Sequence, residues 1–199
     1  MTEKSFQASN KKEQFTKKTG RKIPMIIVLL AVVIAGAFGA FLLSGSSGDT
    51  AIDLPFGEPV ANTRSYIGRV VSMTPVEPLI EAEKVSISLD LLEAYNIVYF
   101  EVENQDGFQV PLMAYITPSG RIFTGSSMCE PCQGRYFSLA GETLVCDACR
   151  TTYTIESHEF ISGSRDCGSY PPVYMKPVVE NGMVSIALED ILQWQIRTY

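Results

Sequence analysis

The sequence predicts a mainly β fold, a β-meander with an inserted segment of two Cys-x-x-Cys pairs, preceded by one N-terminal transmembrane helix. Three observations support this prediction: an uncharged apolar run at 23–43, alternating apolar residues from Val85 onward, and two Cys-x-x-Cys pairs between Cys129 and Cys149. The length of 199 residues suits one ordinary domain with appendages, because domains most often contain about 100–150 residues.

The apolar run at 23–43 contains 21 residues and no charge. About 20 apolar residues are enough for a helix to cross the roughly 30 Å hydrocarbon core of a bilayer. A cleaved signal peptide is the alternative, but its apolar region usually has about 7–15 residues and ends at a small-x-small site. This run is longer and ends in Phe41, Leu42 and Leu43, so we expect an uncleaved helix in contact with membrane lipid.

Residues 1–22 form a basic flank with seven Lys or Arg residues and two Glu residues. Such flanks are retained on the cytoplasmic side, so we expect a cytoplasmic tail and an extracytoplasmic C-terminal domain. Subtracting the flank's net charge of +5 from the formal −6 of the chain leaves −11 for the remainder. An acidic remainder argues against nucleic acid as a partner and favours cationic partners.

Residues 44–77 are predicted to form a linker and an extended arm. Residues 44–51 are rich in Gly and Ser, which is typical of a flexible tether, and 52–78 contains four of the eleven prolines. Within the arm only one strand is predicted, at Tyr66–Ser72. The extracytoplasmic domain itself is expected to span 78–199.

Four apolar runs with strand character follow the arm, and the first of them alternates apolar with smaller or polar residues. The four runs occupy 85–92, 97–104, 109–116 and 121–125. Turn dipeptides separate the later runs, at Asp106-Gly107 and Ser119-Gly120. Short strands joined by tight turns are typical of a β-meander.

The first strand is echoed near the C-terminus. The sequence VSISLDLLEAY at 85–95 resembles VSIALEDILQW at 184–194, and each copy is a strand that runs into a short Leu/Ile-rich segment. The second copy follows the tight-turn dipeptide Asn181-Gly182. Because the two copies bracket the cysteines, we expect one domain with the cysteine segment inserted between its strands.

Five cysteines are the candidate site: Cys129, Cys132, Cys146, Cys149 and Cys167. Each Cys-x-x-Cys turn allows two thiolates to converge on one ion, and two turns supply four tetrahedral ligands. Zinc, a mononuclear iron and an iron–sulfur cluster all accept four thiolates. Disulfides are a further alternative in an oxidising compartment, but an odd number of cysteines leaves one thiol unpaired, which favours metal binding.

Three segments around these cysteines resemble the FtrD-like family of membrane iron–sulfur proteins. They are PSGRIFTGSSMCEPC at 118–132, GETLVCDAC at 141–149 and GSRDCGSYPP at 163–172. All five cysteines match the family's cysteines, and Tyr153 matches its aromatic after the second pair, so the resemblance implies an iron–sulfur cluster or iron, whereas the spacing alone leaves zinc as the alternative. We expect Cys129, Cys132, Cys146 and Cys149 to be the primary ligands, with Cys167 as a fifth ligand, an alternate ligand or a shield. The resemblance also implies a role in extracytoplasmic iron uptake, passing electrons to a membrane permease or handling its metal.

The rest of the sequence argues against an enzyme. The only histidine, His158, could replace a thiolate as a ligand, but a structural role is the simpler interpretation. No Ser/His/Asp set is evident around this histidine, and no Gly-rich phosphate-binding loop is present. We therefore expect an electron carrier or metal-binding component, with a zinc- or disulfide-stapled module that only binds a membrane partner as the alternative.

Overall fold

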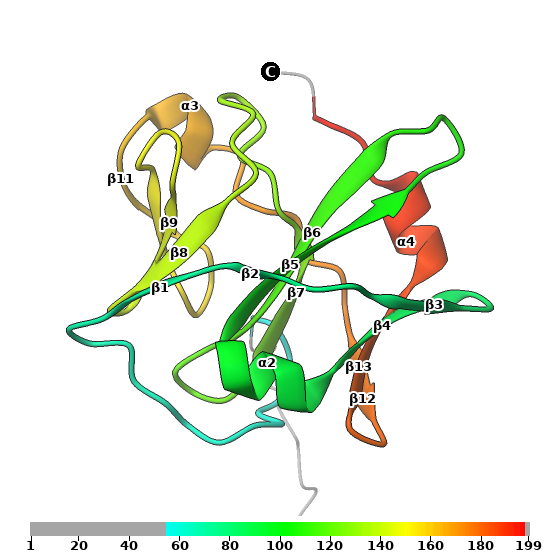
Figure 1. Cartoon of the computed structure of the whole chain (residues 1–199). Helices are drawn as coiled ribbons and strands as arrows, with labels where there is room; N and C mark the ends of the chain where they lie inside the picture. Colours follow the sequence, from blue (N-terminus) through cyan, green and yellow to red (C-terminus); the bar gives the residue numbers. More distant parts are fainter. Residues whose placement is uncertain (1–54, 198–199) are drawn as a thin grey trace, which may run out of the picture. The chain divides into compact units, whose positions relative to one another are not determined.

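The computed structural model describes residues 55–197, which form a mainly β domain of three sheets (Figure 1). The meander sheet has the strand order β2-β5-β6-β7, the clamp sheet β12-β13-β4-β3 and the cysteine sheet β1-β8-β9-β10-β11. The mainly β prediction is confirmed. The predicted transmembrane helix at 23–43 lies outside the described residues, and among residues 55–197 no helix is long and apolar enough to cross a membrane.

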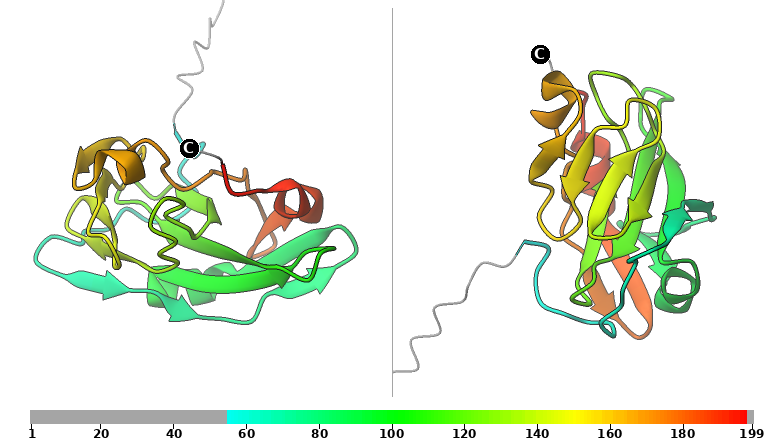
Figure 2. Two further views of the ribbon diagram at one scale, coloured as in Figure 1. Left: turned by 90° about the horizontal axis from the view of Figure 1, so that it is seen from above. Right: turned by 90° about the vertical axis from the view of Figure 1, so that its left-hand side faces the viewer.

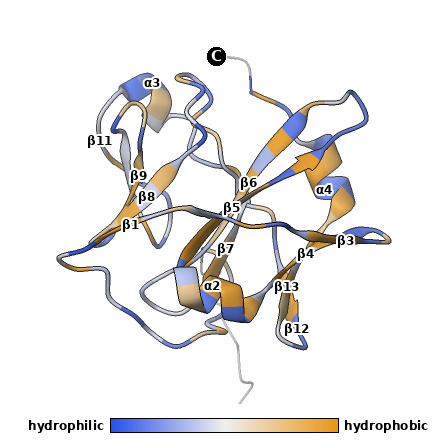
Figure 3. Cartoon of the chain, viewed as in Figure 1, coloured by the Kyte–Doolittle hydropathy of each residue, from blue (hydrophilic) through white to orange (hydrophobic). Residues whose placement is uncertain are grey.

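The meander sheet forms the centre of the domain. Its strands are β2 (Thr74–Pro75), β5 (Ile97–Glu103), β6 (Gln109–Ile116) and β7 (Ile122–Ser126). The last three pair antiparallel in sequence order, which confirms the predicted meander, and β2 adds to β5 in parallel. Seven of the eight residues of β6 are buried, so both faces of this strand are covered. Figure 3 shows the apolar residues gathered along these strands.

The clamp sheet unites the two copies of the repeated sequence. Its strands are β3 (Leu79–Glu81), β4 (Lys84–Ser88), β12 (Val178–Glu180) and β13 (Met183–Ala187), followed by the helices α2 (Leu89–Tyr95) and α4 (Leu188–Gln193). Strands β4 and β13 pair antiparallel around Ser86 and Ser185, whose hydroxyl oxygens are 2.8 Å apart. Val85 lies opposite Ile186 and Ile87 opposite Val184, so equivalent residues exchange places across a local two-fold axis.

The predicted strand at 85–92 is therefore right only in its first half. The chain turns into α2 at Leu89, and the equivalent turn into α4 occurs at Leu188. Two equivalent hydrogen bonds hold these turns: the Leu89 amide donates to the Gly182 carbonyl and the Leu188 amide to the Glu83 carbonyl, both at 2.8 Å. The helix starts are thus fixed by the partner copy rather than by the local alternation.

The cysteine sheet carries the inserted segment. Its strands are β1 (Val70–Ser72), β8 (Phe137–Ala140), β9 (Thr143–Cys146), β10 (Thr152–Thr154) and β11 (Phe160–Ser162), and the short helix α3 (Arg165–Gly168) follows them. The strand predicted at Tyr66–Ser72 forms only over its last three residues. Figures 1 and 2 show the cysteine sheet with α3 and the clamp sheet with α4 on either side of the meander sheet.

The described part of the arm packs on the domain. Tyr66 is fully buried and donates from its hydroxyl to the Ile116 carbonyl at 2.7 Å. The amides of Val60 and Ala61 both donate to the Gly120 carbonyl at 3.0 Å. Gly120 has a φ of 85°, and a Cβ there would lie 2.1 Å from the Ala61 carbonyl oxygen. Only glycine at position 120 therefore lets the arm come this close. The arm thus contributes to the core as well as to two sheets.

Candidate metal centre

Two similar turns present the cysteine thiols. The first turn, which we call knuckle 1 (Cys129–Gly134), follows β7, and the second, knuckle 2 (Cys146–Thr151), joins β9 to β10. In knuckle 1 the Cys129 amide donates to the Gly134 carbonyl at 2.8 Å, and in knuckle 2 the Cys146 amide donates to the Thr151 carbonyl at 2.9 Å. Both turns are therefore closed by the same backbone hydrogen bond, between residues five positions apart.

The residue after each Cys-x-x-Cys pair has a left-handed backbone. Gln133 has a φ of 58° and Arg150 a φ of 61°, which are values that most residues other than glycine seldom adopt. This conformation turns the chain back toward the sulfurs. The amide of Gly134 contacts the Cys132 thiol, and the amides of Ala148 and Cys149 contact the Cys146 thiol. Both knuckles thus direct backbone donors at sulfur, which stabilises thiolates.

The two knuckles bring four thiols together. The sulfurs of Cys129, Cys132, Cys146 and Cys149 all lie within 4.8 Å of one another. Across the knuckles, Cys129 is 3.7 Å from Cys149 and Cys132 is 3.8 Å from Cys146. A tetrahedron of sulfurs bonded at about 2.3 Å to one ion has edges of about 3.8 Å. The four thiols therefore have the spacing and the donor type of a tetrahedral metal site.

The four sulfurs differ in exposure. Cys129 and Cys146 are buried, whereas Cys132 and Cys149 are partly exposed. Donation from the Cys129 thiol, together with the amides of Cys149 and Ala148, outweighs burial and lowers the pKa of Cys146 to about 5. Burial raises the pKa of Cys132 to about 12, against the effect of the Gly134 amide. The pKa of the Cys129 thiol is raised, because this thiol donates a hydrogen bond to Cys146 and because it is buried.

Cys167 lies beside the four thiols but is not one of the group that lie within 4.8 Å of one another. It is buried within α3, where its amide donates to the Ser164 hydroxyl and its carbonyl accepts from the Tyr153 hydroxyl at 2.6 Å. Burial opposes ionisation, but interactions with the thiols of Cys129 and Cys149 lower the pKa of Cys167 overall. The predicted fifth site residue is thus adjacent to one edge of the centre.

A buried ion pair fixes knuckle 1. Glu130, which lies between its two cysteines, is fully buried, and Arg197 Nη2 contacts Glu130 Oε1 at 2.8 Å. The Arg197 amide donates to Glu130 Oε2, also at 2.8 Å. Arg197 further donates from Nη2 to the Pro171 carbonyl at 2.7 Å and lies over the Tyr170 ring. Arg197 therefore joins knuckle 1 to the loop after Cys167.

Glu130, Arg197 and Gly134 were not predicted as site residues. Glu130 and Arg197 are 67 positions apart, and no local pattern marks such a pair. The one available signal was the position of Glu130 inside a Cys-x-x-Cys turn, because a charged side chain there needs a partner of opposite charge.

His158 belongs to an aromatic cluster, and its ring nitrogens have partners other than a metal. Its Nε2 is 2.7 Å from the Tyr115 hydroxyl and its Nδ1 is 3.3 Å from the Pro172 carbonyl. The rings of Phe56 and Phe123 pack against it, with centroids 5.0 and 4.5 Å away. The structural interpretation of His158 is the one that these contacts support.

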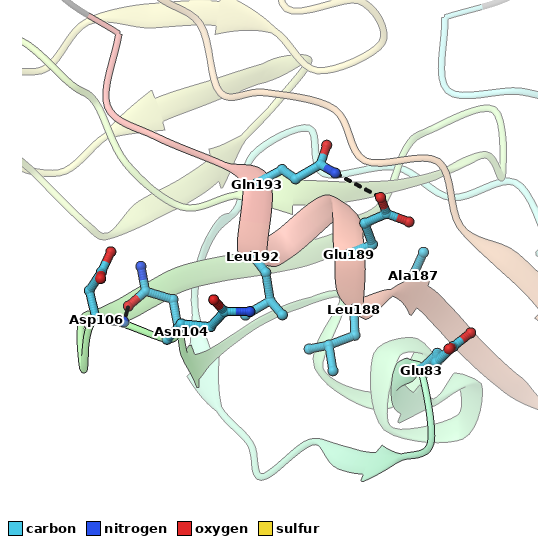
Figure 4. Close-up of a pocket in the computed structure, with 9 residues that line it drawn as sticks. Glu83, Asn104, Asp106, Ala187, Leu188, Glu189, Leu192 and Gln193 are labelled. Atoms are coloured by element: carbon cyan, nitrogen blue, oxygen red, sulfur yellow. Dashed lines mark hydrogen bonds between the residues drawn. The ribbon is translucent and has the colours of Figure 1, made fainter.

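A pocket of about 530 Å³ lies between α4 and the loop that joins β5 to β6, and no cysteine lines it (Figure 4). Glu83, Asp106 and Glu189 contribute carboxylates, and Glu189 accepts a hydrogen bond from Gln193 at 2.7 Å. No metal-binding group of three or more His, Cys, Asp or Glu side chains occurs here among the described residues. The candidate chemistry of the domain is therefore concentrated at the thiols.

The fold and the four convergent thiols define a small β protein with a tetrahedral thiolate site that could hold a metal ion. A family model described as "membrane iron-sulfur containing protein FtrD-like" matches residues 92–197, more than half of the chain. The chain therefore belongs to the FtrD-like family, as its motifs predicted. The family description implies iron and sulfur and an association with the membrane. No curated protein and no solved structure matches the chain significantly.

Proposed function

We propose that this chain is a membrane-anchored extracytoplasmic metal-binding protein that transfers electrons or handles metal for an iron-uptake system. The observation that carries the proposal is the convergence of four thiols from two knuckles in a member of a membrane iron–sulfur family. The proposed ligands are Cys129, Cys132, Cys146 and Cys149. The partner that we propose is a permease or redox protein in the same membrane.

Exposure of two thiols supports a transfer role. Cys132 and Cys149 are partly exposed, so one side of the centre is near solvent and open to a docking partner, while Cys129 and Cys146 face the core. A short tether would hold the centre at high effective concentration beside a neighbouring membrane protein. Thiolate-bound iron can exchange one electron, whereas zinc cannot.

A redox titration combined with a growth assay tests the proposal. The full-length chain, purified anaerobically, is expected to show a redox-active centre within roughly −700 to +450 mV, the span of iron–sulfur centres. Cells that produce Cys129→Ser or Cys146→Ser should grow poorly when iron is scarce. Lys176→Ala, an exposed change remote in sequence from the knuckles, serves as the matched control and should grow like the parent.

The alternative function is a zinc-stapled module that binds a membrane partner without redox activity. Four thiolates at tetrahedral spacing suit zinc as well as iron, which is the observation that keeps this alternative. A colourless zinc-loaded protein without a redox centre, together with normal growth of both serine variants, would reject the electron-transfer proposal in favour of this module.

A further inference from the structure

The spacing of the sulfurs distinguishes one ion from a cluster. In a 4Fe–4S cluster each cysteine thiolate binds a different iron, and in a 2Fe–2S cluster two thiolates bind each of the two irons, with inorganic sulfides between the irons. Thiolates on different irons therefore stand farther apart than the edge of a single tetrahedron, which is about 3.8 Å for bonds of about 2.3 Å. Both pairs that cross between the knuckles, Cys129 with Cys149 and Cys132 with Cys146, are separated by 3.7 and 3.8 Å. All four sulfurs also lie within 4.8 Å of one another, so neither pair stands apart from the other as it would on a second iron. The four sulfurs together thus have the spacing that one shared ion imposes.

Gly134 closes the site from one side. A Cβ at this position would lie 3.0 Å from the Cys146 sulfur, 3.3 Å from the Cys132 sulfur and 2.8 Å from the Ala148 Cβ. A side chain at position 134 would therefore press on a thiol of each knuckle, so the close approach of the two knuckles requires glycine here. Inserting sulfides and further irons between the knuckles would require them to move apart, and glycine would then no longer be needed.

Cys167 occupies an outer position. Its thiol interacts with Cys129 and Cys149 but lies outside the set of four mutually close sulfurs. The bond from the Tyr153 hydroxyl to its carbonyl and the Ser164 cap on its amide hold it there. A polar group beside metal-bound thiolates can tune the potential of the metal.

We infer that the centre holds a single metal ion bound by Cys129, Cys132, Cys146 and Cys149, with Cys167 lying beside these four thiols rather than acting as a ligand. This inference rests on the proposed function only in that both concern the same thiols. It departs from the cluster that the family description suggests, and it leaves the choice between iron and zinc to the metal that the cell supplies.

Stoichiometry on the unmodified full-length chain tests the number of ions. The chain is purified anaerobically from iron-replete cells, and iron, zinc and acid-labile sulfide are measured per chain. We expect one metal ion and no labile sulfide, and X-ray absorption should show one shell of sulfur neighbours without metal–metal scattering. Two or more irons per chain with equimolar sulfide would overturn the inference, although the proposed function would still stand.

Variants test the positions of Cys167 and Gly134. Cys167→Ala should retain one ion per chain while shifting the reduction potential of the iron-loaded protein, and Cys167→Ser, which keeps a polar group, should shift it less. Loss of the ion in Cys167→Ala would show that Cys167 is a ligand. Gly134→Ala should weaken metal affinity by roughly tenfold or more, the size of effect seen for groups that orient ligands. If the double variant Gly134→Ala/Ala148→Gly regained the full metal affinity, the added methyl group would clash with the Ala148 Cβ and not with the sulfurs.

The failure of this inference and the failure of the proposed function are distinguishable. A single bound ion without redox activity or a growth phenotype rejects electron transfer and retains the single-ion site. A cluster with redox activity rejects the single-ion site and retains electron transfer.

Discussion

Arg197→Ala tests whether the buried ion pair holds knuckle 1 in place. Glu130 is fully buried, and Arg197 gives it four contacts: Nη2 to Oε1 at 2.8 Å, Nε to Oε1 at 2.9 Å, Nε to Oε2 at 3.0 Å and the amide to Oε2 at 2.8 Å. The alanine variant removes the three guanidinium contacts and keeps the amide. Removing one partner of a buried ion pair costs about 3–5 kcal/mol. The Arg197 side chain is 37% exposed, so water can partly replace it, and we expect a loss of about 2–3 kcal/mol.

Urea unfolding of the full-length chain in detergent measures this loss. The chain has one tryptophan, Trp194, which is buried three residues before Arg197, so its fluorescence reports on this region. Far-UV circular dichroism reports on the sheets as a whole and separates local fraying from global unfolding. Lys176→Ala is the matched control, because Lys176 is exposed and has no ion pair among the described residues.

A double variant completes the test. Glu130→Gln removes the buried charge, so Arg197→Ala should cost less in that background than in the parent. If Arg197→Ala and Lys176→Ala had the same free energy of unfolding within about 0.5 kcal/mol, the usual range for surface substitutions, the ion pair would not stabilise knuckle 1.

Two further predictions concern the core. Burial lowers the pKa of His158 to about 4 from its ordinary 6.5, so between these pH values the unfolded chain binds more protons than the folded chain. Stability should therefore fall by about 3 kcal/mol as the pH drops from 6.5 to 4. Metal-free His158→Asn, whose asparagine suits the φ of 58°, should lack this component in urea unfolding, and equal pH slopes would contradict the assignment. Gly125→Ala should destabilise by about 3 kcal/mol, because its Cβ would lie 1.9 Å from the Val173 carbonyl oxygen. An unchanged thermal midpoint in circular dichroism would exclude that close approach.

Local patterns predicted the meander and missed the helices. The runs at 97–104 and 109–116 are long, apolar and separated by a turn at Gly107, whose φ of 76° suits glycine, so period and turn chemistry agree. The continuation of the strand at 85–92 was wrong because alternation persists through Leu89 and Leu91. The chain turns there only because a carbonyl at Gly182, far along the sequence, accepts the Leu89 amide.

The four thiols were predictable for the same reason that the meander was. A Cys-x-x-Cys turn specifies its geometry within a few residues. The two turns meet because β8, which follows knuckle 1, pairs with β9, which leads into knuckle 2. The groups that surround the thiols carry no local signal. Gly134 acts through its lack of a side chain, and Arg197 acts through Glu130, which lies 67 positions earlier in the sequence. Whether the thiols bind metal stays a prediction.

The two-fold pairing of β4 with β13 has a consequence for the order of folding. Ser86 and Ser185 are 99 positions apart, so this pair closes a ring of chain that contains the meander and both knuckles. Closing a flexible ring becomes costlier as its length grows, by about 0.6 kcal/mol for each doubling. A folded meander and an ion that ties the knuckles together both shorten the flexible part of that ring. The clamp should therefore close last, and chains without metal should close it more slowly and leave the apolar faces of β4 and β13 exposed for longer.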